Sequence, residues 1–263
     1  MKMLNAVLIE SNKITDSIFD EFINNTDNKE FEAYDAVIVG LLEDLIGKVM
    51  SLKTLLDANS YDSLDIIART IFETHVYLKY ILALNTKDRA MAYAKSAELS
   101  EFKLYDRVTE ETKAGEELRG FIGKSITDIK AANLKASNES YRDKLTSDYL
   151  KLLNTTRVST NWFNEDGKTG NFEQLCIKQG LKSEYELVYR MFSKDVHSNK
   201  ALSRLRFSKN EVQVGNFNVI PSLHSGMSAR FLVESSSAVL EYYNLKNTLK
   251  YFNPMFKVNN KYK

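Results

Sequence analysis

The hydrophobic and polar positions of this chain follow the period of amphipathic helices for most of its length. Apolar residues recur every three or four positions over residues 3–24, 30–58 and 61–84, with short polar stretches between them. This spacing predicts three helices, of which the first is an N-terminal helix preceding a core of about residues 30–245.

The same period continues more weakly through the middle of the chain. Residues 87–112 are rich in charged side chains, and residues 115–135 and 140–153 carry narrower apolar stripes, so this section predicts either a lid or a peripheral hairpin of helices. Residues 154–170 lose the helical period and predict a long loop. The remaining predicted elements are a short helix at residues 171–179 ended by Gly180, a small β-hairpin at residues 205–214, and a last helix from Ser222 to about Leu245.

Together these elements predict an all-α multi-helix bundle that forms a single helical domain over residues 1–263, with a basic C-terminal tail at residues 246–263. The chain contains only ten Gly and two Pro, fewer turn-forming residues than an all-β protein of this size needs. Hydrophobic residues make up 43% of the sequence, which is enough for a sizeable core.

The sequence also indicates where the protein resides. No apolar run reaches the length of a membrane span, and the N-terminus lacks the basic-then-apolar pattern of a signal peptide. The single cysteine, Cys176, excludes an intramolecular disulfide. We therefore expect a cytoplasmic protein without a membrane partner.

Residues 185–199 are the stretch with the clearest signs of chemistry. Ser183, followed three residues later by Glu186, is a capping-box signature and predicts the start of a helix. Arg190 and His197 are seven residues apart on that helix, so they point the same way with roughly 10 Å of axial rise between them. A neighbouring apolar stripe consists of Tyr185, Val188, Tyr189, Phe192 and Val196.

Arg190 and His197 allow two interpretations. A guanidinium and an imidazole directed into one cleft can bind a phosphate and transfer a proton. Alternatively, Arg190 pairs with Glu186 at i, i+4, and a charged His197 stabilises the helix end. In that case the chain is a catalytically inactive helical module that binds protein or nucleic acid. The spacing leaves both interpretations open.

The charge of the chain is unevenly distributed, although its net charge is only +1. Residues 10–62 carry twelve Asp or Glu against four Lys, whereas residues 196–263 carry ten Lys or Arg against three Glu. Within this basic end, four cations follow His197 before the first acid. They belong either to an ordinary solvated face or to an electrostatic footprint for a phosphate backbone. These cations are Lys200, Arg204, Arg206 and Lys209.

A second charged pair lies in the apolar helix predicted at residues 61–84. Arg69 and Glu73 are spaced i, i+4 and can pair with each other. They need this pairing if they are buried, because an uncompensated charge in a core costs several kcal/mol. The pair either holds two helices in register or places Glu73 beside Arg190 and His197. We interpret His75, in the same helix, as a packing residue.

Other motifs of enzyme chemistry are missing from the sequence. It contains neither G-x-x-x-x-G-K-[ST] nor G-x-G-x-x-G, so a glycine loop for nucleotide binding has no support. Its three histidines and one cysteine lack metal-ligand spacing. We therefore expect neither a metal nor a cofactor.

The order of the charged and aromatic motifs resembles a known family. An R-x-x-x-E in an apolar helix, a loop with a tryptophan, and then Y-x-x-x-Y-R-x-x-S-x-x-x-H are similar to the bacterial domain of unknown function 5677 family over most of residues 35–215. Separately, the R-x6-H within the last motif resembles the R-x(4–6)-H pattern of HEPN ribonucleases, which are all-helical and usually dimeric. Met191 stands where those enzymes often have Asn, Asp or His. Here the motifs consist of Arg69, Glu73, Trp162, Tyr185, Tyr189, Arg190, Ser193 and His197.

This resemblance implies a HEPN-like core and metal-independent cleavage of RNA, in which the ribose 2′-hydroxyl attacks the adjacent phosphate and leaves a cyclic phosphate. His197 would act as general acid or base, and Arg190 would stabilise charge on the phosphoryl oxygens. Many such proteins are toxins or act in phage defence, so an antitoxin or defence protein is an expected partner beside RNA. Supporting residues would be Arg69, Glu73, Ser193 and Asp195, and RNA-binding residues would be Lys194, Lys200, Arg204, Arg206 and Lys209.

A homodimer is expected as well, because in-line transfer needs both an acid and a base, and a second copy would supply the other histidine. Two surfaces are candidates for the contact. One is the helix over residues 30–58, whose Gly40 and Gly47 share a face. The other is the last helix, with the apolar residues Phe231, Leu232, Val239 and Leu240.

Overall fold

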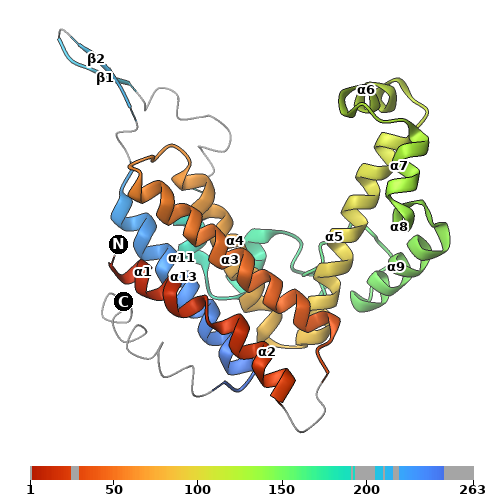
Figure 1. Cartoon of the computed structure of the whole chain (residues 1–263), viewed down its shortest axis with the longest axis horizontal. Helices are drawn as coiled ribbons and strands as arrows, with labels where there is room; N and C mark the ends of the chain where they lie inside the picture. Colours follow the sequence, from red (N-terminus) through yellow and green to blue (C-terminus); the bar gives the residue numbers. More distant parts are fainter. Residues whose placement is uncertain are drawn as a thin grey trace. The chain divides into compact units, whose positions relative to one another are not determined.

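The structure is a computed structural model that describes residues 2–24, 30–190, 192, 205–209, 211–215 and 219–245. It divides into two compact units, unit 1 (Met1–Thr86 and Leu175–Lys263) and unit 2 (Lys87–Gln174). Helices dominate both units (Figure 1), and the described residues contain only two short strands, so the predicted all-α multi-helix fold with a small hairpin is confirmed. The single helical domain over the whole chain stays a prediction, because it concerns how the two units associate.

Unit 1 is a bundle built around α13 (Pro221–Tyr242). This helix packs against α1 (Lys2–Ser11), α3 (Ala33–Asp57) and α4 (Leu64–Ala83), as Figure 1 shows. Apolar stripes of all four helices meet between them, which removes their side chains from water and stabilises the bundle. Its core includes the fully buried side chains of Val7, Leu42, Leu45, Phe72, Val76, Leu232 and Leu240.

The N-terminal helix predicted at residues 3–24 is in fact two helices, α1 and α2 (Ile14–Asn24). The backbone N–H of Lys13 donates to the carbonyl of Glu10, only three residues back, so the last turn of α1 tightens and the α-helical ladder ends. Just before this turn, the buried hydroxyl of Ser11 shares a 3.2 Å hydrogen bond with that of Ser236 in α13. A polar contact with another helix therefore fixes the end of α1.

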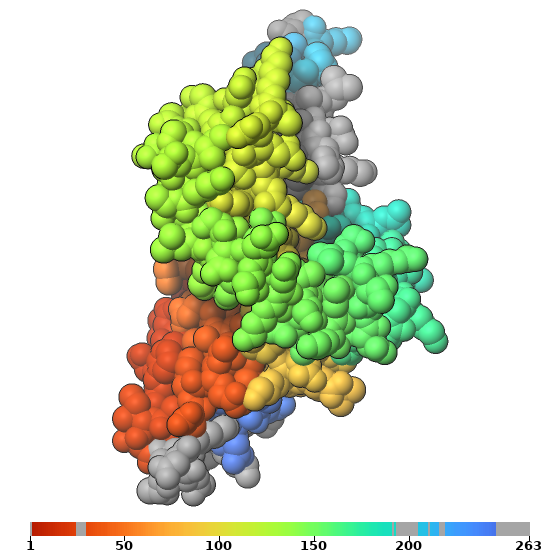
Figure 2. All heavy atoms as spheres, turned by 90° about the vertical axis from the view of Figure 1, so that its right-hand side faces the viewer, coloured from red at the N-terminus to blue at the C-terminus, as the bar shows by residue number. Residues whose placement is uncertain are grey.

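Unit 2 consists mainly of α5 (Thr86–Thr109), α6 (Lys113–Ile122), α7 (Ile126–Ala132), α8 (Leu134–Ser137) and α9 (Glu139–Leu152). Its surface is coloured yellow to green in Figure 2. Side-chain hydrogen bonds join α9 to α5: the Tyr141 hydroxyl donates to Glu98 at 2.8 Å, and Arg142 donates to Asp106 at 2.6 Å.

The single helix predicted at residues 115–135 is replaced by α6, α7 and α8. Gly123 ends α6 in the left-handed region at φ +64°, and Ser125 then caps α7 through a capping box with Asp128.

Gly115, near the start of α6, is required because of a close approach between two helices. A Cβ at this position would lie 2.3 Å from the carbonyl oxygen of Glu110, because the start of α6 packs directly on the end of α5.

The loop predicted at residues 154–170 contains no helix or strand, as expected. It is nevertheless packed against the helices of unit 2, because Trp162 is buried and meets the ring of Tyr93 in α5 edge-on at 5.1 Å. The Tyr149 hydroxyl also donates to the carbonyl of Thr160 at 2.5 Å. After the loop, α10 (Phe172–Lys178) is followed by Gly180 at φ +72°, as predicted.

The predicted hairpin consists of β1 (Leu205–Phe207) and β2 (Val212–Val214), paired antiparallel with Arg206 opposite Gln213. Alternation along the strands places Arg206 and Gln213 on one face and the apolar residues on the other. Among the helices that the structure describes, none is both long and apolar enough to cross a membrane.

Candidate functional site

A short helix, α11 (Lys182–Glu184), precedes the segment that was predicted as a helix at residues 185–199. The segment itself begins with a π-helical turn, η1 (Tyr185–Arg190). Beyond this turn, only Phe192 of the segment lies within the described residues. The α-helical geometry predicted for residues 185–190 is therefore wrong. π-Helical turns are rare, join residues five apart and occur frequently at functional sites, which makes this turn the centre of the candidate site.

The capping box predicted for Ser183 and Glu186 is also wrong. The N-cap of α11 is Leu181, so Ser183 lies inside the helix. The N–H of Leu181 donates to the carbonyl of Cys176 at 2.8 Å, immediately after the left-handed Gly180. The chain thus passes from α10 into α11 through one tight turn, which starts the new helix before Ser183 is reached.

The π-helical turn is anchored on α4 by Arg69. Its Nε donates to Oε1 of Glu73 at 3.1 Å, and its Nη2 donates to the hydroxyl of Tyr189 at 2.7 Å. The guanidinium also lies 4.1 Å from the centre of the Tyr189 ring, and this ring stacks on Tyr185 at 5.1 Å. The pairing of Arg69 with Glu73 follows the predicted i, i+4 spacing, but it is Arg69, through Tyr189, that contacts the segment. Their catalytic support stays a prediction.

Arg190 is the last residue of the turn, and its side chain is 61% exposed. Its Nη1 lies 3.0 and 3.1 Å from the two carboxylate oxygens of Glu186. This is the i, i+4 contact expected of an inactive helical module. An exposed pair of this kind contributes at most about 1 kcal/mol, so a phosphate could replace the Glu186 carboxylate as the partner of the guanidinium.

Sequence reasoning missed a buried carboxylate–imidazole pair beneath this segment. Oδ1 of Asp65 in α4 lies 2.6 Å from Nε2 of His224 in α13, and both side chains are buried. Nδ1 of His224 donates to the carbonyl of Ile220 at 2.9 Å, and its ring stacks on Phe192 at 4.9 Å. No local spacing indicates this pair, because its two residues are 159 positions apart in the sequence.

A second missed group surrounds Arg230 in α13. Its Nε donates to Glu234 at 2.8 Å, and its Nη2 donates to Glu184 of α11 at 3.0 Å. Arg230 therefore ties α11 to α13 much as Arg69 ties η1 to α4. The two pairs share one sequence signal, because Arg230 and Glu234 are also an i, i+4 pair within an apolar helix.

His75 packs in the core, in agreement with its interpretation as a packing residue. Its Nδ1 lies 2.8 Å from the hydroxyl of Ser235, and its ring stacks on Phe231 at 4.9 Å. Burial lowers the pKa of His75 to about 4, although the nearby carboxylate of Glu234 raises it. His75 is therefore a neutral ring at neutral pH.

Several predicted site residues lie outside the residues that the structure describes, and their roles stay predictions. Two of the predicted RNA-binding residues are described: Arg206 on β1 and Lys209 in the hairpin turn, both exposed. Their exposure fits either a solvated face or a phosphate contact. The residues outside the described ranges are Ser193, Lys194, Asp195, His197, Lys200 and Arg204.

One of the two surfaces considered for dimerisation is occupied within the chain. The apolar residues of α13 are buried in unit 1, so the prediction that this helix offers spare surface to a partner is wrong. Gly40 and Gly47 of α3, in contrast, are exposed, and a Cβ at either position would meet no atom within 4 Å. The buried α13 residues are Phe231, Leu232, Val239 and Leu240.

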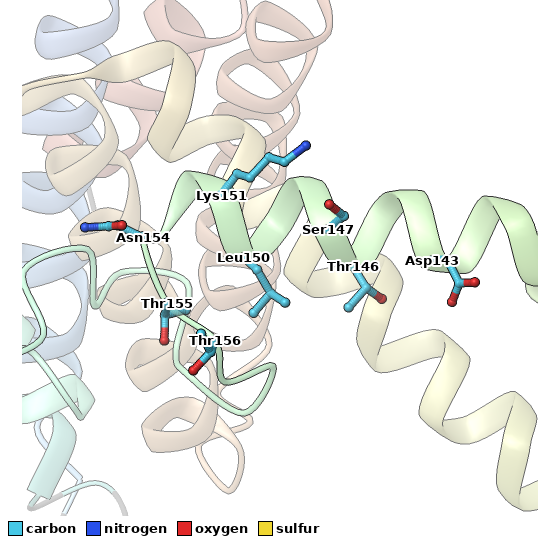
Figure 3. Close-up of a pocket in the computed structure, with 8 residues that line it drawn as sticks. All are labelled: Asp143, Thr146, Ser147, Leu150, Lys151, Asn154, Thr155 and Thr156. Atoms are coloured by element: carbon cyan, nitrogen blue, oxygen red, sulfur yellow. The ribbon is translucent and has the colours of Figure 1, made fainter.

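No group of three or more His, Cys, Asp or Glu that could hold a metal ion occurs in the described part of the chain. A cavity of about 750 Å³ lies along α9 and the residues that follow it in unit 2. Figure 3 shows that its lining side chains diverge, because Lys151 and Ser147 point to the opposite side of the helix from Leu150. The cavity therefore lacks the converging polar groups of a ligand site.

Comparison with known proteins gives one match. The family model described as Family of unknown function (DUF5677) matches residues 35–213, which include α3 from Asp35 onwards, α4, η1 and the first strand of the hairpin. No curated protein and no solved structure matches the chain.

Proposed function

We propose that this chain, which belongs to the family of unknown function DUF5677, is a metal-independent endoribonuclease with a HEPN-like R-x6-H site. In this proposal Arg190 binds the scissile phosphate and His197 transfers protons. His197 lies outside the described residues, so its part rests on the sequence spacing alone.

The observation that supports the proposal most is the position of Arg190. Its side chain is exposed at the end of a π-helical turn, directly after Tyr189, which Arg69 holds by a 2.7 Å hydrogen bond. An anchored backbone with an exposed guanidinium suits phosphate binding, because the planar group can hold two phosphoryl oxygens without reorganisation of the turn.

The reaction needs only groups that this chain and its substrate contain. The ribose 2′-oxygen attacks the adjacent phosphorus and loses its proton to a general base, while the bond to the 5′-oxygen breaks. A general acid protonates this leaving oxygen, which gives a 2′,3′-cyclic phosphate and a 5′-hydroxyl end. Histidine suits both steps because its unperturbed pKa lies near neutrality. Arg190 would offset the charge that develops on the phosphoryl oxygens.

A homodimer would supply one acid and one base from two copies of His197. The cations Lys194, Lys200, Arg204, Arg206 and Lys209 would extend the RNA contact beyond the cleft. We place the protein in the cytoplasm, as a toxin or an effector of phage defence that an antitoxin or another defence protein restrains. The single cysteine is compatible with that reducing compartment.

Incubation of the purified full-length chain with labelled RNA tests the proposal. We expect cleavage that persists in the presence of a chelator and leaves ends with a cyclic phosphate. Cleavage that stops on addition of the chelator and returns with a divalent metal would contradict the mechanism.

A second candidate is the catalytically inactive binding module. The contact of Arg190 with Glu186 at 3.0 Å favours it, because the guanidinium then has a structural partner on its own turn. This module would bind RNA or protein without cleaving it. RNA binding without cleavage by the wild-type chain, unchanged in a His197→Ala variant, would favour the module over the nuclease.

A further inference from the structure

We propose that unit 2 carries a docking surface for a second copy of this chain, formed by the groove between α5 and α7 and by the exposed face of α6. These three helices lie next to one another at one end of unit 2 (Figure 1). The proposal goes beyond the proposed function, because the surface lies in unit 2 and the R-x6-H segment belongs to unit 1. Association is measured as mass without RNA, so it can be present or absent independently of ribonuclease activity.

The groove is open to solvent and mainly apolar between α5 and the end of α6 with α7, where its volume is about 460 Å³. A neighbouring, more polar hollow of about 530 Å³ shares four lining residues with this apolar part, so the two form one continuous groove along α5. The apolar part is lined by Leu104, Val108, Ile122, Ile129 and Ala132.

The face of α6 beside this groove is exposed in the described part of the chain. Gly115 is the only buried residue of this helix. Leu118, Phe121 and Ile122 follow at i, i+3 and i+4 and therefore share one face. Phe121 is 92% exposed, and its neighbour Ile122 lines the groove, so a projecting aromatic side chain stands directly beside an apolar hollow.

A projection beside a hollow is self-complementary under two-fold symmetry. In a two-fold dimer the same patch of both copies meets, so Phe121 of each copy can enter the groove of the other. The apolar area also comes close to that of a stable interface. With roughly 200 Å² for a fully exposed Phe and about 100 Å² for Leu or Ile, the exposed side chains present about 400 Å². The apolar share of one side of a stable interface is about 450 Å². These side chains are Leu104, Leu118, Phe121, Ile122 and Leu134.

The charges at the rim favour a second copy over a strongly charged partner. Glu101 and Lys124 both line the groove and carry opposite charges. Asp128, also at the rim, is already used to cap α7 through Ser125. A rim that carries both an acidic and a basic side chain does not favour a uniformly basic or acidic partner. Two-fold pairing, in contrast, allows Glu101 of one copy to meet Lys124 of the other.

The first experiment measures the mass of the full-length chain by sedimentation equilibrium at micromolar concentration. We expect a dimer for the wild type and a rise of about 30-fold or more in the dissociation constant for Phe121→Glu, because a carboxylate would be buried in the apolar groove. Ile23→Glu is the matched control, since Ile23 is 78% exposed in unit 1 and should leave the dimer intact. A monomeric wild type, or a Phe121→Glu variant that dimerises as tightly as the control, overturns the proposal.

A second experiment tests the pairing itself. One chain carries Leu104→Cys and another carries Phe121→Cys; the native Cys176 is buried. Oxidation of the mixture should give a disulfide-linked species of two chains, because position 121 of one copy enters the groove beside position 104 of the other. The mixture of Phe121→Cys with Ile23→Cys should give none. Equal cross-linking in the two mixtures contradicts the docking surface even if the wild type is dimeric.

Discussion

Arg69 contacts Tyr189 twice: its Nη2 donates to the phenol oxygen at 2.7 Å, and its guanidinium lies 4.1 Å from the centre of the ring. The two residues are 120 positions apart in the sequence. Glu73 holds the other side of the guanidinium at 3.1 Å, so a carboxylate, a cation and an aromatic ring connect α4 to the π-helical turn that ends at Arg190.

The Tyr189 hydroxyl should contribute measurably to stability. Tyr189→Phe keeps the ring and removes one hydrogen bond to a charged donor, and water can replace this bond in part because the site is half-buried. We expect a loss of about 1 kcal/mol in the free energy of unfolding, against about 2–3 kcal/mol for Tyr189→Ala, which also removes the cation–π contact. Urea unfolding measures both values. Equal stability of the two variants would mean that the ring contact contributes nothing.

The Arg69–Glu73 pair should show coupling that is smaller than that of a fully buried pair. The two side chains are 18% and 28% exposed, so a partner left alone is still partly hydrated. We expect Arg69→Ala and Glu73→Ala to cost about 1–2 kcal/mol each, rather than the 3–5 kcal/mol of a completely buried pair. The double variant should cost about 0.5–1 kcal/mol less than the sum of the single ones. Strictly additive losses in urea unfolding would show that the two residues do not interact.

The main helices and the charged pair of α4 could be predicted because local spacing determines them. The predicted ranges 30–58 and 61–84 agree closely with α3 and α4, since long apolar stripes pack wherever another helix covers them. The i, i+4 rule found Arg69 and Glu73. The same rule applied to α13 would have found Arg230 and Glu234, which bind each other at 2.8 Å.

Other features depend on contacts that the local sequence does not contain. The π-helical turn is locally unfavourable, and it is held by Tyr189 against a residue of α4, so no periodicity in residues 185–190 indicates it. The break between α6 and α7 is different. Gly123 followed by the capping-box sequence Ser125 to Asp128 is a local signal for it, which the weak apolar stripe of residues 115–135 obscured.

The buried His75 should make stability depend on pH. Its pKa is about 4 in the folded chain against 6.5 for a free imidazole, so the unfolded chain binds the proton more readily between these values. The contribution of the neutral His75 ring to the free energy of unfolding is therefore fully present above about pH 6.5 and is lost as the pH falls towards 4. Over this range His75 should account for about 3 kcal/mol of lost stability.

His75→Phe is the control for this prediction, because the ring stacks on Phe231 and a phenyl group can occupy its place. The variant should unfold with a flatter dependence on pH between about 6.5 and 4, measured by urea unfolding at several pH values. The groups that face His75 and titrate or carry charge nearby, Glu234, Lys79 and Arg230, remain in both proteins. Identical pH profiles would show that His75 is not a buried neutral ring.

Substitutions in the R-x6-H pair should reduce RNA cleavage without reducing the stability of the fold. Arg190 is exposed and its pair with Glu186 contributes at most about 1 kcal/mol, so Arg190→Ala should unfold almost like the wild type. If the guanidinium stabilises the transition state, the same variant should lose at least about a hundredfold in RNA cleavage. His197→Ala should lose cleavage as well.

Two companion variants sharpen this test. Arg190→Lys keeps the charge but cannot hold two phosphoryl oxygens, so it should restore only a small part of the activity. Glu186→Ala removes the carboxylate that competes with phosphate and should leave cleavage unchanged or raise it. Undiminished cleavage by His197→Ala would eliminate the catalytic role of the histidine.

The hairpin provides the last prediction, which concerns RNA binding rather than cleavage. Arg206 on β1 and Lys209 in the turn are exposed, and a cation that neutralises a phosphate releases counterions from RNA. Arg206→Ala with Lys209→Ala should therefore weaken binding to all RNA sequences alike and reduce the slope of log affinity against log salt by up to about two units. Gln213→Ala is the matched control, because Gln213 pairs with Arg206 on the same face of the hairpin but carries no charge. If the slope of the double variant equals that of the control, these cations belong to an ordinary solvated face and the RNA path lies elsewhere.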